Sequence, residues 1–194
     1  MREPQPQPVF TADQIQFAVQ KVAVEVKDWL KISGANVLNL VCVLEGARFF
    51  ARDLNRALKD LSSQWLIREH FIRVQGTQGH ELLETRSLFD EALDAAVLTR
   101  DPVLIVDDLL DSGKTLEAVR KHLVQMGARE QKAAVLIQKY ESSEVPVDFC
   151  GLALGLRRED LAAKGLRDCW LFGYGMDWDG CYRDLDYVAW VEVK

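Results

Sequence analysis

The sequence predicts a single α/β domain in which a mostly parallel, twisted sheet is flanked by helices. Short, nearly continuous apolar runs alternate with helical patterns of about 10 to 15 residues. Runs that are apolar at almost every position are typical of strands buried on both faces, as in a parallel sheet. The 194 residues contain no internal repeat and no linker. One domain over residues 1–194 is therefore expected.

The N-terminal half is expected to open with a helix. Thr11 and Gln14 form a capping-box pattern, apolar residues then recur at helical spacing, and Gly34 is the expected stop. The elements expected next are a buried strand at 37–44, an amphipathic helix at 47–61 and a second strand at 65–74.

Residues 75–99 interrupt this alternation. They are polar at first, contain glycines at 76 and 79, and show only a weak helical pattern near 82–96. A gap of this length inside a compact domain is often a functional flap. The alternation then resumes, with strands expected at 102–106, 133–138, 149–154, 169–172 and 187–193 and a helix at 114–126.

The composition excludes several classes of protein. The chain has 24 Lys and Arg against 30 Asp and Glu, a net charge of −6, which argues against a broad nucleic-acid surface. The sequence shows no membrane-spanning run and no secretory signal. The four cysteines form no C-x-x-C pair. We expect a cytoplasmic protein with reduced thiols, with neither a nucleic-acid nor a membrane partner.

Residues 103–115 carry the strongest chemical signal, because an apolar strand runs directly into acids, a small-residue turn and a helix start. Ligands of open α/β sheets bind at this edge. The backbone N–H groups and hydroxyls of the turn suit a phosphate; its residues are Ser112, Gly113, Lys114 and Thr115. Asp107 and Asp108 are good acceptors for the two hydroxyls of a sugar. The alternative, that both acids only cap the following helix, stays open at this point.

A Walker A loop would share Gly113-Lys114-Thr115 with this segment. That motif requires a glycine five places before Gly113, where Asp108 stands. A P-loop kinase or NTPase is therefore disfavoured.

The segment VLIVDDLLDSGKT (103–115) resembles the phosphoribosyl-pyrophosphate motif of type I phosphoribosyltransferases. Stretches 40–54 and 170–189, with HFIRV (70–74) and the lysine of VLIQKY (135–140), resemble the branch that acts on 6-oxopurines. This resemblance implies a flap at about 75–99 and a small base-binding hood at about 155–194 plus the N-terminal segment. It also implies purine salvage: transfer of 5-phosphoribosyl from phosphoribosyl pyrophosphate to hypoxanthine or guanine, with Mg²⁺, by a homodimer or homotetramer.

The resemblance assigns roles to individual residues. Asp107 and Asp108 would bind the ribose hydroxyls, the turn from Asp111 to Thr115 would hold the 5′-phosphate, and Asp111 would exchange a proton with purine N7. The remaining assignments are Lys139 to the exocyclic O6, Trp170 to stacking on the base, Leu171 to the base edge, Asp177 to the base and Mg²⁺, and Arg183 to pyrophosphate. Asp107 and Asp108 join Asp177 as expected metal contacts. Taken singly, three of these residues also fit roles without a ligand. Lys139 could be a solvated lysine at a strand end, Trp170 a core residue and Arg183 a surface ion-pair partner.

The chain departs from the family pattern at two places. Glu45 precedes Gly46 in the loop that would grip pyrophosphate, where the family usually has a basic residue, so a carboxylate there needs a compensating charge such as Mg²⁺ or Arg48. Gly76-Thr77 stands where the flap normally has a Ser-Tyr pair. These departures favour the alternative function, a non-catalytic protein that binds phosphoribosyl pyrophosphate or a nucleotide as a regulatory signal.

Overall fold

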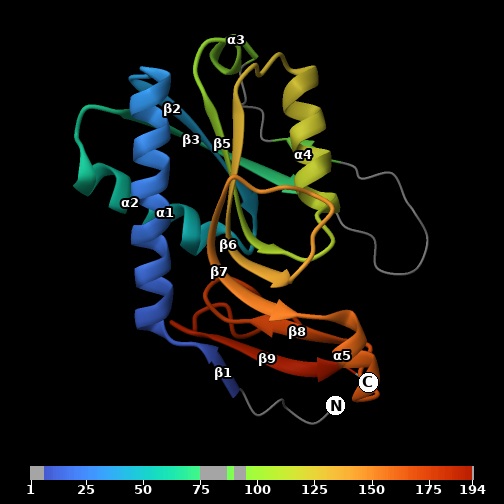
Figure 1. Ribbon diagram of the computed structural model, residues 1–194. Coiled ribbons are helices and arrows are strands. Elements are labelled where there is room, and N and C mark those ends of the chain that lie inside the picture. The colour runs from blue at the N-terminus through green and yellow to red at the C-terminus, as the bar shows by residue number, and fades with distance from the viewer. Residues whose placement is uncertain (1–6, 75–86, 90–94, 194) are drawn as a thin grey trace.

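The main sheet has six strands in the order β4-β3-β2-β5-β6-β7 (Figure 1). The structure is a computed structural model, and it describes residues 7–74, 87–89 and 95–193. The strands are β2 (Val37–Leu44), β3 (Leu66–Val74), β4 (Ser87–Phe89), β5 (Val103–Leu110), β6 (Gln131–Tyr140) and β7 (Phe149–Leu156). Neighbours from β3 to β7 pair in parallel, and β4 pairs antiparallel with β3. The predicted α/β fold with a mostly parallel sheet is confirmed.

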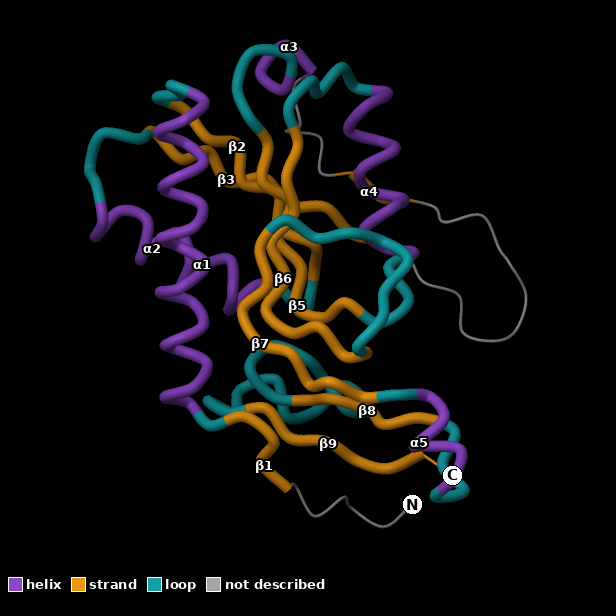
Figure 2. Tube along the Cα trace, in the orientation of Figure 1, coloured by secondary structure: helices purple, strands orange, loops and turns teal. Residues whose placement is uncertain are grey.

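Helices cover both faces of this sheet. Helices α1 (Ala12–Ser33) and α2 (Arg48–Leu61) lie on one face, and α4 (Lys114–Gln125) lies on the other, as Figure 2 shows. Each face has its own buried cluster: Phe50 and Leu104 belong to the first, Leu116 and Ile105 to the second. Burial on both faces explains why the strands of the sheet are apolar at almost every position. No helix in the described part of the chain is long and apolar enough to cross a membrane.

Helix α1 begins and ends where the sequence predicts. The Thr11 side chain accepts a hydrogen bond from Gln14 N, and the Gln14 side chain accepts one from Thr11 N, which satisfies two N–H groups of the first turn. Gly34 ends the helix with a left-handed backbone, φ 67°.

A second, three-stranded antiparallel sheet has the order β1-β9-β8. Its strands are β1 (Gln7–Phe10), β8 (Asp168–Phe172) and β9 (Val188–Val193), so the N-terminal segment lies beside the C-terminal one (Figure 1). Helix α5 (Arg158–Ala163) lies near this sheet. The sequence patterns predicted neither β1 nor α5. One hydrophobic cluster includes both Leu104 of the main sheet and Val188 of the small one.

The weak pattern near 82–96 suggested a helix, and this prediction is wrong at residues 87–89, which form strand β4. The open edge of β3 offers backbone partners to this segment, and a weak pattern does not outweigh them. Residues 75–86 and 90–94, with Gly76 and Thr77, lie outside the described residues. A short α3 (Ala95–Leu98) follows.

Candidate active site

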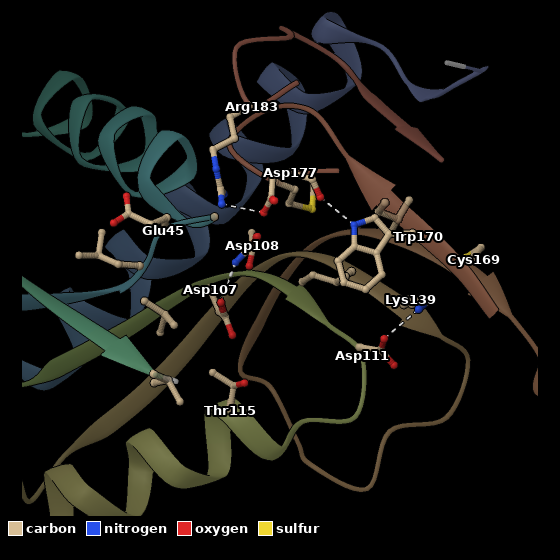
Figure 3. Close-up of a pocket in the computed structure, with 17 residues that line it drawn as sticks. Glu45, Asp107, Asp108, Asp111, Thr115, Lys139, Cys169, Trp170, Asp177 and Arg183 are labelled. Carbon is tan, nitrogen blue, oxygen red and sulfur yellow. Dashed lines mark hydrogen bonds and ion pairs between the residues drawn. The ribbon is translucent and has the colours of Figure 1, made fainter. Parts of the chain in front are cut away.

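A cavity of about 370 Å³ opens at the edge of the main sheet where its parallel strands end (Figure 3). Its walls come from the ends of β2, β5 and β6, from the start of α4, from β8 and from the segment after β8. The predicted site residues that line it are Glu45, Gly46, Asp107, Asp108, Asp111, Thr115, Lys139, Trp170, Leu171, Asp177 and Arg183. Ser112, Gly113 and Lys114 are not among the lining residues; they form the turn between Asp111 and Thr115.

Asp107 and Asp108 lie inside β5 rather than after it, because the ladder with β6 continues past the apolar residues. Adjacent strand residues point to opposite sides. In Figure 3 Asp108 points toward Arg183 and Asp107 toward Thr115. Burial and the neighbouring Asp108 charge raise the pKa of the Asp107 carboxyl well above its usual value, and burial also raises that of Asp108. Asp107 is buried and Asp108 half-buried, and no cation within the described residues makes an ion pair with either carboxyl, so both can hydrogen-bond to the hydroxyls of a sugar.

Gly46 lets the β2 loop approach Asp108 closely. A Cβ atom at residue 46 would lie 1.9 Å from Asp108 Oδ2, so a side chain there would displace this carboxylate. A Cβ atom at Gly175 would lie 2.3 Å from Gly46 O, and the φ of Gly175 is 101°. These two glycines bring three chain segments together at one end of the cavity.

The turn before α4 suits an anion. Gly113, the N-cap residue of α4, has φ 77° and no side chain, and Ser112 Oγ accepts from Lys114 N at 3.5 Å. A Cβ atom at Gly113 would lie 2.5 Å from Val145, so glycine is required for space as well as for conformation. The other N–H groups of the first turn, with the positive end of the helix dipole, are available to a ligand.

Lys139 lies inside β6 with a side chain only 3% exposed, so it is not the solvated strand-end lysine that the sequence also allowed. Its Nζ lies 2.8 Å from Asp111 Oδ2 and 2.8 Å from Asp168 Oδ1. Burial alone would lower the pKa of this ammonium, but the two carboxylates raise it above its usual value. Arg158 NH2 lies 3.6 Å from Asp111 Oδ1. Asp111 therefore lies between two cations.

Trp170 is 52% exposed and borders the cavity, so it is not a core residue. Its Nε1 donates to Asp177 O at 2.7 Å, which fixes the orientation of the ring. Figure 3 shows the indole on the same side of the cavity as Lys139. The next residue, Leu171, is buried and also lines the cavity.

Asp177 and Arg183 form an ion pair across the segment that follows β8. Arg183 NH2 lies 2.6 Å from Asp177 Oδ1, and Arg183 NH1 donates to Gly175 O at 2.7 Å. Gly180 N donates to Asp177 Oδ2 at 2.8 Å. Arg183 is ion-paired and 39% exposed, as the alternative also allowed, but it is held at the Asp108 end of the cavity and lines it (Figure 3).

The carboxylate of Glu45 has a charge partner that the sequence did not predict. Arg73, at the end of β3, makes an ion pair with Glu45. The compensating residue is therefore Arg73 rather than Arg48. The peptide bond between Leu44 and Glu45 is cis.

The cavity offers carboxylates for a cation but no ready-made metal cage. Over residues 7–74, 87–89 and 95–193, no group of three or more His, Cys, Asp or Glu side chains is arranged to hold a metal. This donor set fits Mg²⁺, which usually takes one or two carboxylates and completes its shell with substrate phosphates and water.

The phosphoribosyl transferase domain family matches residues 11–151. The chain belongs to this family. The hypoxanthine-guanine phosphoribosyltransferase of Mycobacterium avium is 30% identical over 191 residues, covering 96% of this chain and 85% of that protein. The enzyme of the same name from Crithidia fasciculata is 31% identical over 189 residues, covering 92% and 81%. A solved hypoxanthine phosphoribosyltransferase of Trypanosoma cruzi superposes with a TM-score of 0.78 at 28% identity, covering 97% and 93%.

Three residues of this phosphoribosyltransferase that contact its predicted site residues were missed by sequence reasoning: Arg73, Arg158 and Asp168. Asp168 directly precedes a predicted strand, and Arg73 lies in the HFIRV stretch, so both were within reach of the sequence patterns. Neither residue is of a type that by itself indicates a functional site, because arginine and aspartate usually lie on the surface.

Proposed function

We propose that this phosphoribosyltransferase transfers the 5-phosphoribosyl group of phosphoribosyl pyrophosphate to hypoxanthine or guanine. The observation that carries the proposal is the Lys139–Asp111 pair at 2.8 Å, on the cavity wall beside an exposed tryptophan. An ammonium suits the 6-oxo group of the base, a carboxylate suits a proton on its imidazole ring, and an indole suits its face. A protein that senses only a sugar phosphate has no need of this set.

The cavity supports one order for the parts of the substrates. The 5′-phosphate fits the turn before α4, and the ribose hydroxyls fit Asp107 and Asp108. The pyrophosphate fits the end where Gly46 and Arg183 meet. The base then occupies the space between Trp170 and Lys139. This order aligns the base nitrogen with the anomeric carbon, opposite the leaving group.

Bond formation between purine N9 and the anomeric carbon, with loss of pyrophosphate, leaves an extra proton on the imidazole ring of the base. In the proposed reaction Asp111, which lines the cavity, accepts this proton at N7. Lys139 donates to O6 and stabilises the charge that develops there. Arg183 faces the leaving pyrophosphate. Asp177, with Asp107 and Asp108, supplies carboxylates for Mg²⁺, which when bound neutralises the pyrophosphate.

A panel of nucleobases, each offered with phosphoribosyl pyrophosphate and Mg²⁺, tests the proposal. We expect nucleoside monophosphate and pyrophosphate from hypoxanthine and guanine, and at least tenfold lower kcat/KM for adenine, because the Lys139 ammonium has no acceptor on the 6-amino group. Faster turnover of adenine than of both 6-oxopurines would contradict the proposal. Light scattering on the same sample measures the proposed homodimer or homotetramer.

Trp170→Ala should raise the KM for hypoxanthine about tenfold and leave the KM for phosphoribosyl pyrophosphate within twofold. The ring can stack on the base but lies away from the phosphate turn (Figure 3). Steady-state kinetics with each substrate varied in turn measures both constants. Phe17→Ala is the control, since Phe17 is an exposed aromatic of α1 outside the cavity lining. Equal rises in both KM values would show that Trp170 only supports the local structure.

One specific observation favours the alternative, regulatory function: the carboxylate of Glu45 lies at the end of the cavity proposed for pyrophosphate. The Arg73 ion pair reduces the repulsion between this carboxylate and pyrophosphate. Binding of phosphoribosyl pyrophosphate without product from any base would favour the regulatory function over catalysis.

A further inference from the structure

Asp168 is the carboxylate at the centre of a hydrogen-bond network behind the cavity. Its Oδ1 receives three donors: Lys139 Nζ at 2.8 Å, the Tyr140 hydroxyl at 2.7 Å and Cys169 N at 2.7 Å. Asp168 is not among the residues that line the cavity, whereas Lys139 and Cys169 are. Asp168 can therefore act on a ligand only through its partners.

The network keeps the Asp168 carboxylate charged. Partial burial by itself raises the pKa of this carboxyl, but the hydrogen bonds from Lys139 and Tyr140 outweigh it and hold the pKa below its usual value. Burial and the bond to Asp168 raise the pKa of the Tyr140 hydroxyl to about 12, so this hydroxyl stays a donor. Two neutral donors and one cation thus surround a permanent negative charge.

The Lys139 ammonium has three N–H donors. Asp111 and Asp168 each take one, which leaves one for the cavity that Lys139 lines. Two carboxylates on a tetrahedral ammonium fix the direction of the third donor. With Asp168 removed, Lys139 would be held by Asp111 alone, its third donor would lose its direction, and the Asp111 carboxylate would carry the whole pairing.

We propose that Asp168 is a positioning residue for base selection, which aims the free Lys139 donor at the 6-oxo group and shares the ammonium so that Asp111 stays available to the base. The inference rests on the proposed function. Asp168 also lies two positions before Trp170 on β8, so the two side chains project from the same face of one strand. One strand thereby places the stacking ring and the anchor of the ammonium.

Asp168→Asn tests this role, with Asp148→Asn as the matched control. Asp148 likewise pairs with a cation, Arg120 at 3.0 Å, and accepts a backbone N–H, from Ala133 at 2.9 Å. The two side chains are similarly exposed, 36% and 30%, but Asp148 is not among the lining residues, and in the described part of the chain it makes no ion pair with Lys139. Each variant removes one carboxylate charge that pairs with a cation and accepts a backbone N–H of a strand. A merely structural effect should therefore appear in both.

We expect Asp168→Asn to raise the KM for hypoxanthine at least tenfold, to leave the KM for phosphoribosyl pyrophosphate within twofold and to reduce the preference for hypoxanthine over adenine at least fivefold. Asp148→Asn should leave all three unchanged. Tyr140→Phe keeps the carboxylate and removes one of its donors, so it should shift the KM for hypoxanthine in the same direction by about two- to fivefold. This variant carries the test if Asp168→Asn does not fold.

Calorimetric binding of inosine monophosphate separates this inference from the proposed function. If the wild type makes no nucleotide from any base, the proposed function is wrong, and the affinities of the variants for the nucleotide still decide the role of Asp168. If the wild type is active but Asp168→Asn matches Asp148→Asn in base KM, in base preference and in nucleotide affinity, the positioning role is wrong while the function stands.

Discussion

Asp111→Asn should lower kcat with hypoxanthine by about 10²–10⁴-fold while the affinity for phosphoribosyl pyrophosphate stays within a few-fold. Asparagine has nearly the same shape and keeps one oxygen that can accept from Lys139 Nζ, which lies 2.8 Å from Asp111 Oδ2. It cannot accept the proton from the base. The phosphate should be bound by the backbone of the turn before α4, which the substitution leaves in place.

Two measurements on the same preparation separate these effects. Steady-state turnover at saturating substrates gives kcat, and equilibrium binding of phosphoribosyl pyrophosphate gives the affinity. Asp148→Asn controls for the loss of one negative charge elsewhere in the chain. Normal turnover of a folded Asp111→Asn protein would identify another group as the proton acceptor. A large loss of affinity for the sugar phosphate would instead place Asp111 in phosphate binding.

Lys139→Gln should abolish most of the preference for 6-oxopurines over adenine, a loss of about 10- to 100-fold in the ratio of kcat/KM values. A glutamine amide can turn either its donor or its acceptor toward the base, whereas an ammonium has donors only. The ratio measured with hypoxanthine and adenine under identical conditions is the readout. An unchanged ratio would mean that the O6 contact comes from another group.

The same variant should also be less stable, because it leaves Asp111 and Asp168 without their shared cation. Breaking a fully buried pair typically costs about 3–5 kcal/mol. The side chains of Asp111 and Asp168 are 39% and 36% exposed, so water compensates in part. We expect the free energy of unfolding to fall by about 1–3 kcal/mol. Urea unfolding measures it. Lys132→Gln, also on β6 but not among the residues that line the cavity, is the control for base preference.

The sequence by itself determined most of the helices and strands and the position of the turn before α4. Strands buried on both faces must be apolar throughout, so the run at 37–44 could be read directly and is β2. The capping box of Thr11 and Gln14 is local to one helical turn, so the start of α1 was equally readable. The acids, turn and helix of 103–115 are contiguous, and contiguity keeps them together at the sheet edge in any α/β fold.

Only the tertiary structure decided which charges meet. Lys139 and Asp111 are 28 positions apart, as are Arg73 and Glu45, and each pair comes together because parallel strands end at the same edge of the sheet. No local pattern shows that Lys139 is buried, since a lysine near a strand end is usually solvated. Likewise β1 forms a strand because β9 offers it backbone partners, although its own segment is rich in proline and glutamine. Local periodicity determines most of the elements, whereas packing of distant segments determines edge strands such as β1 and the partners of a charge.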